Sequence, residues 1–196
     1  MHSLAPPPAA AHRPPMPDFI RTVPPGDDRE RLTCPDCGSV AYENPKIVVG
    51  SVVAEEGRVM LCRRAIEPRR GYWTLPAGYM EMRETVEEGA RREAWEEARA
   101  RIALDGVLAV YSIARIGQVQ VIFRARLAEP GFEAGPESLE VGLFGWGEVP
   151  WDGIAFPSVH WALRAWRDTA HARLSAPALN PPSDPRGTRP LQDTEA

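Results

Sequence analysis

The segment of this sequence best suited to chemistry is an acidic, helix-forming stretch in which five glutamates fall within eleven residues. They are Glu87, Glu88, Glu93, Glu96 and Glu97. Glu93 precedes Glu96 by three residues and Glu97 by four, so a helix places these three carboxylates on one face, where like charges repel. Such runs are often solvated helix faces, but this spacing also suits a divalent cation that prefers hard oxygen ligands, such as Mg²⁺ or Mn²⁺.

A Pro-Ala-Gly segment at residues 76–78 precedes this helix and could complete a metal site. Gly78 has no side chain, so the backbone can approach a ligand closely, and the carbonyl of Ala77 can add a backbone oxygen. Arg92 can pair with Glu88 one turn earlier, but it cannot neutralise all three aligned carboxylates. Because protein-bound Mg²⁺ commonly completes its shell with phosphate oxygens, the sequence predicts a phosphate compound as substrate.

The hydrophobic pattern predicts strands and helices on both sides of the acidic segment. Thr85 and Glu88 resemble a capping box and place the acidic helix at residues 85–100. Proline at position 157 suits the first turn of a last helix. The predicted strands are 47–54 and 59–62 as a hairpin, 73–78, 102–115 paired with 118–127, and 141–149, with a loop at 129–140.

Charge and composition exclude several classes of function. The formal net charge of −4 and the pI near 5.6 argue against binding to nucleic acid or an anionic membrane. The sequence contains no apolar run of about 18 residues that would span a bilayer, and it begins without the charged start and apolar stretch of a secretory signal. Three cysteines cannot all pair, so we expect a reducing, cytoplasmic environment.

Proline marks the expected domain boundaries. Of the 21 prolines in 196 residues, six fall within residues 1–17 and five within residues 177–196. We therefore predict disordered tails at 1–17 and 175–196, a short cysteine-bearing segment at 18–44, and one catalytic domain at 45–174.

The acidic segment and its flanks resemble the signature box of the Nudix hydrolase family. That box is a glycine, five residues, a glutamate, seven residues, Arg-Glu, an aliphatic, any residue, Glu-Glu, any residue, a glycine and an aliphatic. This chain matches it with Gly78, Glu84, Arg92-Glu93 and Glu96-Glu97. The resemblance covers roughly residues 34–166. It implies an α/β fold, the Nudix α/β/α sandwich with a mixed β-sheet, preceded by a short zinc-ribbon-like segment.

Arg99 is the one clear departure from the box, because the family has a glycine there. A glycine would end the helix in the left-handed conformation, which costs other L-residues roughly 1–2 kcal/mol. Either the helix continues for another turn or Arg99 is strained. Neither alternative removes a metal ligand.

The resemblance also implies roles for individual residues. The expected metal ligands are Glu93, Glu96, Glu97 and the carbonyl of Ala77. Arg92 corresponds to the arginine that orients these glutamates, and Glu84 to a residue that supports the turn into the helix. The implied reaction is Mg²⁺- or Mn²⁺-dependent hydrolysis of a nucleoside diphosphate linked to another group. The catalytic base is either Glu97 or a glutamate of the later loop, Glu137 or Glu140.

The substrate is less closely defined than the family. Residues 42–46, 73–78 and 155–158 resemble the subgroup that acts on ADP-ribose, FAD or NADH-like dinucleotides. We expect substrate contacts from Arg63, Arg64, Trp73 and Gly78, although aromatics near strand ends are more often core. The alternatives are a nucleoside triphosphate pyrophosphohydrolase, a non-catalytic nucleotide sensor and, weaker still, a zinc-ribbon adaptor. Homodimers are common in the family, and the sequence leaves the oligomeric state open.

Cys34 and Cys37, in the sequence Cys-Pro-Asp-Cys-Gly, resemble one half of a zinc ribbon. Structural zinc needs four ligands. The stretch roughly fifteen to twenty residues earlier has no cysteine, and no histidine beyond His12. Cys62 lies in a predicted strand and is expected in the core. We therefore expect a degenerate ribbon without Zn²⁺, the alternative being one four-cysteine site shared by two chains.

Overall fold

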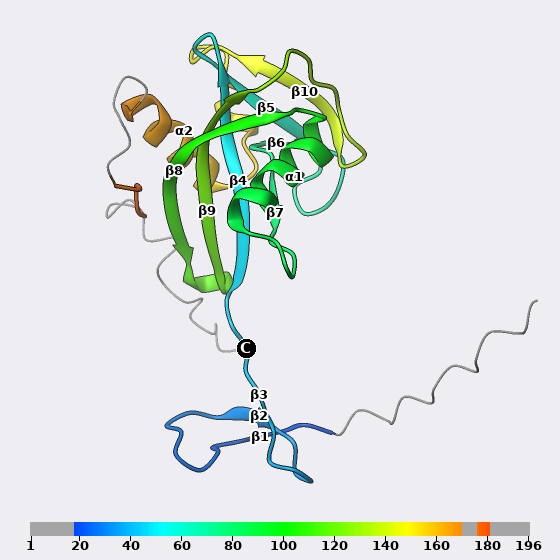
Figure 1. The fold of residues 1–196 in the computed structure, drawn as a ribbon, viewed down its shortest axis with the longest axis vertical. Coiled ribbons are helices and arrows are strands. Elements are labelled where there is room, and N and C mark those ends of the chain that lie inside the picture. The colour runs from blue at the N-terminus through cyan, green and yellow to red at the C-terminus, as the bar shows by residue number, and fades with distance from the viewer. Residues whose placement is uncertain (1–17, 170–175, 181–196) are drawn as a thin grey trace, which may run out of the picture. The chain divides into compact units, whose positions relative to one another are not determined.

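The computed structural model describes residues 18–169 and 176–180 (Figure 1). The chain divides between Asn44 and Pro45 into two compact units. The first unit is a small antiparallel sheet with the order β1-β2-β3. Its strands are β1 (Ile20–Thr22), β2 (Arg31–Thr33) and β3 (Val40–Ala41).

The second unit contains a mixed sheet of seven strands. They are β4 (Lys46–Glu55), β5 (Arg58–Arg64), β6 (Trp73–Thr74), β7 (Ala77–Tyr79), β8 (Ile102–Ile113), β9 (Gln118–Leu127) and β10 (Ser138–Phe144). The main order is β10-β5-β4-β9-β8, with β6 beside β5 and β7 beside β4. Strands β4 and β9 are parallel and the other pairs are antiparallel. The predicted hairpin and the later strand pair are both present.

Two helices, α1 (Val86–Ala98) and α2 (Pro157–Thr169), cover different faces of this sheet (Figure 1). Alternate residues of a strand point to opposite faces. Val53 and Met60 accordingly pack with Ala94 of α1, whereas Val52 packs with Leu163 of α2. The predicted α/β/α sandwich with a mixed sheet is confirmed. None of the described helices is long and apolar enough to cross a membrane.

The acidic helix begins with the predicted capping box. The Glu88 N–H donates to Thr85 Oγ1 at 3.2 Å, and the Thr85 N–H donates to the Glu88 carboxylate at 2.8 Å. The helix ends at Arg99, which is left-handed with φ 49° and ψ 23°. Of the two alternatives for Arg99, the structure therefore shows the strained one. Its N–H and that of Ala100 donate to carbonyls of the last turn, which secures the helix end.

Strand boundaries differ from the prediction at two places. The predicted strand 73–78 is broken at Leu75-Pro76 into β6 and β7, because a proline has no N–H for the ladder. Strand β10 begins at Ser138 inside the predicted loop and ends at Phe144, so Glu140 is a strand residue. Its polar residues mask the extended pattern in the sequence, but they suit a strand at the edge of the described sheet, next to β5.

The segment after the predicted boundary at 174 contains described residues that pair with β8. The Ala178 N–H donates to Leu108 O, and the Val110 N–H donates to Ala178 O, both at 2.8 Å. The side-chain amide of Asn180 makes two further bonds to the main chain of Ser112, at 2.7 and 2.8 Å. This part of the predicted tail therefore covers an edge of the sheet. The tail predicted at 1–17, and residues 175 and 181–196 of the tail predicted at 175–196, lie outside the described residues.

Candidate functional site

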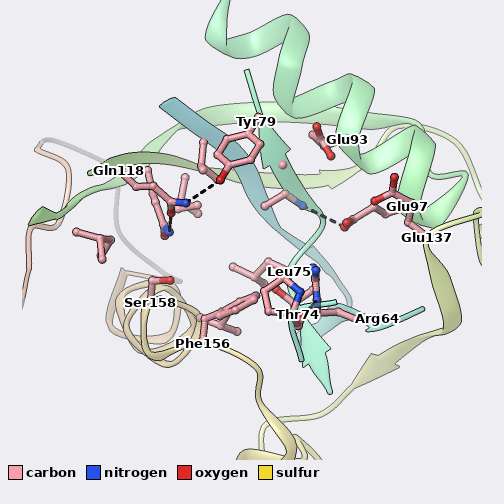
Figure 2. Close-up of a pocket in the computed structure, with 18 of the residues that line it drawn as sticks. Arg64, Thr74, Leu75, Tyr79, Glu93, Glu97, Gln118, Glu137, Phe156 and Ser158 are labelled. Atoms are coloured by element: carbon pink, nitrogen blue, oxygen red, sulfur yellow. Dashed lines mark hydrogen bonds between the residues drawn. The ribbon is translucent and has the colours of Figure 1, made fainter. Parts of the chain in front are cut away.

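A cavity of about 570 Å³ lies in the second unit, between the sheet and the start of α2. Carboxylates of α1 reach it beside β7, and side chains of β9 line it at the other end (Figure 2). The α1 residues lining it are Arg92, Glu93, Glu96 and Glu97. The structure thus brings the three carboxylates of the predicted helix face to one cavity, together with Arg92, Ala77 and Gly78.

Glu97 is the most enclosed of these carboxylates, with 5% of its surface exposed. Its Oε2 accepts a hydrogen bond from the Ala77 N–H at 3.2 Å (Figure 2). Burial raises the pKa of Glu97 to about 8, and the negative charges of Glu93 and Glu137 add to this effect. The Ala77 N–H and the positive charge of Arg64 act in the opposite direction. The positive charge around Glu97 is therefore too small to keep the pKa of this carboxyl at its ordinary value.

Arg92 connects the other carboxylates. Its guanidinium donates to Glu93 Oε1 at 2.7 Å and to Glu96 Oε2 at 2.9 Å, and makes two bonds to Glu84 at 2.8 and 3.0 Å. This pairing holds the pKa of Glu84 at about 2. Burial nevertheless raises the pKa of Glu93 above its ordinary value. Arg92 also donates to the Tyr79 carbonyl at 3.0 Å, which ties α1 to β7.

Gly78 is required by the closeness of β7 to α1. A Cβ at this position would lie 2.5 Å from both carboxylate oxygens of Glu93. We expected a close approach of a ligand to the backbone at Gly78, and in the structure the Glu93 side chain makes this approach. Any larger residue at 78 would displace this carboxylate.

The carboxylate oxygens at this cavity are the type of ligand that a hard divalent cation prefers. Three carboxylates gather at one cavity, and burial raises the pKa of two of them. Within residues 18–169 and 176–180, however, no three acidic, histidine or cysteine side chains are arranged around a single point. Arg92 binds Glu93 Oε1 and Glu96 Oε2 in this conformation, so a cation that leaves these bonds in place would take the other oxygen of each carboxylate.

The predicted substrate-contacting residues separate into two groups. Arg64 lines the cavity, with its guanidinium 5.4 Å from the ring centre of Phe156. Arg63 is not among the lining residues: it donates to the Gly71 carbonyl at 2.9 Å and lies 3.7 Å from Glu140. Trp73 also lies outside the lining, packed edge-on against Phe144 at 4.9 Å between ring centres. Arg63 and Arg64 are adjacent on β5, and adjacent residues of a strand point to opposite faces, so only Arg64 faces the cavity.

The two loop glutamates proposed as alternative bases are also separated. Glu137 lines the cavity with Glu93 and Glu97 (Figure 2). Glu140 is on β10 and pairs with Arg63 on an exposed surface. The geometry therefore favours Glu137 of the two.

Polar residues that sequence reasoning missed also line this cavity, and among them are Tyr79, Gln118 and Gln120. The available signal was a Gln-Val-Gln alternation at the start of a strand whose centre, residues 121–123, is apolar. Such an alternation marks one polar face of a strand.

Comparison with known proteins shows the family of the chain. The NUDIX domain model matches residues 44–161, which is more than half of the chain. The chain belongs to the Nudix family. The Nudix N-terminal family matches residues 19–43, which correspond to the first unit. A solved Nudix hydrolase from Nitrosomonas europaea is 43% identical, with a TM-score of 0.78 over 84% of this chain and 94% of that one.

Two curated Nudix relatives match smaller parts of the chain. A MutT-like protein of Streptomyces ambofaciens is 42% identical over 79 residues, which are 40% of this chain and 49% of that protein. An ADP-ribose pyrophosphatase of Methanocaldococcus jannaschii is 27% identical over 113 residues, which are 56% of this chain and 67% of that protein. The chain thus spans about half the length of the Streptomyces protein.

The cysteine pair lies in the first unit. The Gly38 N–H donates to Cys34 O and the Cys34 N–H to Ser39 O, which closes a tight turn between β2 and β3. Cys34 is buried, and backbone N–H groups of Cys37 and Asp36 lower its thiol pKa. Cys37 is exposed, and neither cysteine forms a disulfide. The absence of zinc stays a prediction, because two cysteines make only half of a four-ligand site.

Proposed function

We propose that this Nudix hydrolase cleaves the pyrophosphate bond of a nucleoside diphosphate linked to another group. One observation carries the proposal: the buried carboxylates Glu93 and Glu97 share a cavity with the cationic Arg64. Such a cavity can hold a cation at one side and attract phosphate oxygens from the other. The membership of the chain in the Nudix family supports the same reaction class.

The proposed cofactor is Mg²⁺ or Mn²⁺. Glu93, Glu96, Glu97 and the Ala77 carbonyl would hold it, because hard oxygen ligands select these ions. When bound, it would neutralise charge on the pyrophosphate and lower the pKa of an attacking water. Arg92 would keep Glu93 and Glu96 oriented through its present hydrogen bonds.

Glu137 is the proposed general base. A base must lie within hydrogen-bond reach of the reacting water. Glu137 faces the cavity, and its charge contributes to raising the pKa of both Glu93 and Glu97, which places it close to them. Glu97 is the alternative base. The exposed ion pair of Glu140 with Arg63 makes Glu140 the weakest candidate.

The proposed substrates are ADP-ribose and related dinucleotides such as FAD. A cavity of about 570 Å³ is within the range of small-molecule and cofactor sites. The matched protein of Methanocaldococcus jannaschii is named an ADP-ribose pyrophosphatase, which supports this class. The three cysteines are all free, which supports a reducing, cytoplasmic compartment.

A hydrolysis panel tests this function. Purified full-length protein is incubated with ADP-ribose, FAD, NADH and nucleoside triphosphates in Mg²⁺, in Mn²⁺ and in chelator, and the products are separated by chromatography. We expect AMP from ADP-ribose or a dinucleotide only when metal is present. Pyrophosphate released from triphosphates alone would favour a triphosphate pyrophosphohydrolase, and binding without cleavage would favour a sensor.

A further inference from the structure

The wall of the cavity on β9 and β7 carries a row of polar side chains that the proposed hydrolysis does not use. Gln118 and Gln120 are two residues apart on β9, so their side chains share one face of the sheet. In the register of the sheet, Gln120 is opposite Val48 of β4, and Val48 is opposite Tyr79 of β7. All four residues line the cavity.

Hydrogen bonds connect the three polar groups. Gln120 Nε2 donates to Gln118 Oε1 at 3.3 Å, and Gln118 Nε2 donates to the Tyr79 hydroxyl at 3.2 Å (Figure 2). Each amide has two N–H donors and two carbonyl lone pairs. Among the described residues, one N–H of each glutamine, the Gln120 carbonyl and the Tyr79 O–H are left without a bond. The row therefore presents donors and acceptors together to the cavity.

Part of the wall around this row is apolar, beside the polar Arg115 and Ser158 that also line the cavity. Ile113, Ile122 and Val159 line the cavity with it. A half-buried amide in such a wall loses water and gains stability only when its donors and acceptors are bonded. A flat ring with both donors and acceptors at its edge satisfies both conditions, since its faces contact the aliphatic side chains and its edge meets the amides.

At its far end, Gln118, this row lies about one nucleotide length from the carboxylates, whereas Gln120 and Tyr79 lie nearer to them, opposite Val48. Ala77, whose N–H binds Glu97, is opposite Gly50 of β4, whereas Gln118 is opposite Lys46. Four residues of strand separate these two positions, which is about 13 Å. Figure 2 shows Gln118 and Glu97 on opposite sides of the cavity, with Tyr79 between them. This separation is comparable to the length of a nucleoside monophosphate.

We propose that Gln118, Gln120 and Tyr79 form the subsite that recognises the nucleobase, with the phosphates at the carboxylate end. The assignment rests on the proposed function, because it supposes that the substrate is a nucleotide. It makes the two glutamines specificity-determining residues that bind the substrate without taking part in bond cleavage.

Binding of two products tests the subsite without requiring turnover. AMP and ribose 5-phosphate share the sugar and phosphate, and only AMP has a base. Their affinities are measured by calorimetry for the full-length wild-type protein and for Gln118→Met and Gln120→Met, which keep the side-chain length. Arg126→Met is the control, since Arg126 is on the same strand but outside the cavity lining. Thermal melts verify that each variant folds.

We expect the wild type and the control to bind AMP more tightly than ribose 5-phosphate. Each glutamine variant should lose about tenfold in AMP affinity, the effect of losing the hydrogen bonds of one amide, with no change for ribose 5-phosphate. Tyr79→Phe, which keeps the ring, provides a second variant if a methionine variant does not fold, and it should weaken AMP alone. Equal affinities of the wild type for the two ligands, or equal losses for both, would overturn the subsite.

The turnover panel separates this inference from the proposed function. If ADP-ribose is cleaved with the same KM by wild type and Gln118→Met, the function stands and the subsite is wrong. If no nucleoside diphosphate derivative is cleaved but AMP binding depends on Gln118, the function is wrong and the base-binding row stands.

Discussion

The backbone N–H of Ala77 donates to the Glu97 carboxylate at 3.2 Å, across twenty residues of sequence. This bond joins β7 to α1 at the most buried of the three cavity carboxylates. The bond also orders the site, because β7 holds Gly78 as well as Ala77, and Gly78 packs against the Glu93 carboxylate. A single short strand thus positions two of the carboxylates assigned to the metal, one by a hydrogen bond and the other by close packing.

Gly78→Ala should impair catalysis more than folding. The new methyl group would lie 2.5 Å from both Glu93 oxygens, so the carboxylate must move. A displacement of this kind at a reacting centre costs about 100-fold in kcat. The measurement is steady-state hydrolysis together with a thermal melt. Gly147→Ala is the control, since a Cβ there meets nothing within 4 Å. A Gly78→Ala enzyme with unchanged kcat would show that the Glu93 position is unimportant.

Glu137→Gln and Glu140→Gln should differ strongly. Glu137 faces the cavity, whereas Glu140 makes an exposed ion pair with Arg63 at 3.7 Å. If Glu137 is the general base, its loss should reduce kcat by about 100-fold or more. Glu140→Gln should remain within about twofold of wild type, because exposed ion pairs contribute little. The measurement is kcat as a function of pH for the wild type and both variants, which tests the role of Glu137 as the general base. Similar effects of the two substitutions would contradict the assignment of the base to Glu137.

Glu84→Gln should destabilise the protein in a pH-dependent way. Pairing with Arg92 holds the native pKa of Glu84 at about 2, below the ordinary value of 4.5. A depressed native pKa stabilises the fold above about pH 4.5, and this contribution is lost as the pH falls toward 2. We expect a loss of about 1–2 kcal/mol in unfolding free energy at pH 7.

Urea unfolding of wild type and Glu84→Gln in chelator, at pH 7 and pH 3, measures this difference. The difference between the two proteins should shrink at the lower pH. Glu87→Gln is the control, because Glu87 is an exposed glutamate in the first turn of α1, three residues after Glu84. A difference that stays constant between the two pH values would contradict the role of the Glu84–Arg92 pair.

Arg99→Gly should stabilise the chain slightly. Arg99 is left-handed with φ 49°, a conformation that glycine adopts at no steric cost. Part of the gain is offset because the Arg99 guanidinium lies 5.6 Å from the Trp95 ring centre. We expect a net increase of up to about 1 kcal/mol in unfolding free energy. Arg91→Gly, inside the same helix, should instead destabilise by about 1 kcal/mol. Destabilisation by Arg99→Gly would show that its side-chain contacts outweigh the backbone strain.

The sequence predicted local structure best where one short pattern determines it. The capping box of Thr85 and Glu88 and the regular spacing of the glutamates located α1 within a residue or two. The sequence could not decide whether the helix continues past Arg99 or ends there in the left-handed conformation. The energy difference between these two alternatives depends on packing. The start of strand β10 was predicted too far along the chain, because an edge strand tolerates polar residues that a loop also favours.

Site residues on strands were harder to predict than those on the helix. Alternation shows that Arg63 and Arg64 point to opposite faces, but not which face borders the cavity. That choice depends on where α2 and the loop before it pack. The row of Gln118, Gln120 and Tyr79 was missed for a similar reason, since it forms only when β7 and β9 lie on either side of β4.

The most direct test of the central claim is the rate of AMP release from ADP-ribose in Mg²⁺ or Mn²⁺ by wild type, Glu97→Gln and Glu87→Gln. Glu97 is buried at the cavity, whereas Glu87 is exposed on the same helix. We predict metal-dependent release by wild type and Glu87→Gln, and a loss on the order of 1000-fold for a folded Glu97→Gln. Near-normal release by Glu97→Gln would contradict the assignment of this carboxylate to metal-dependent cleavage.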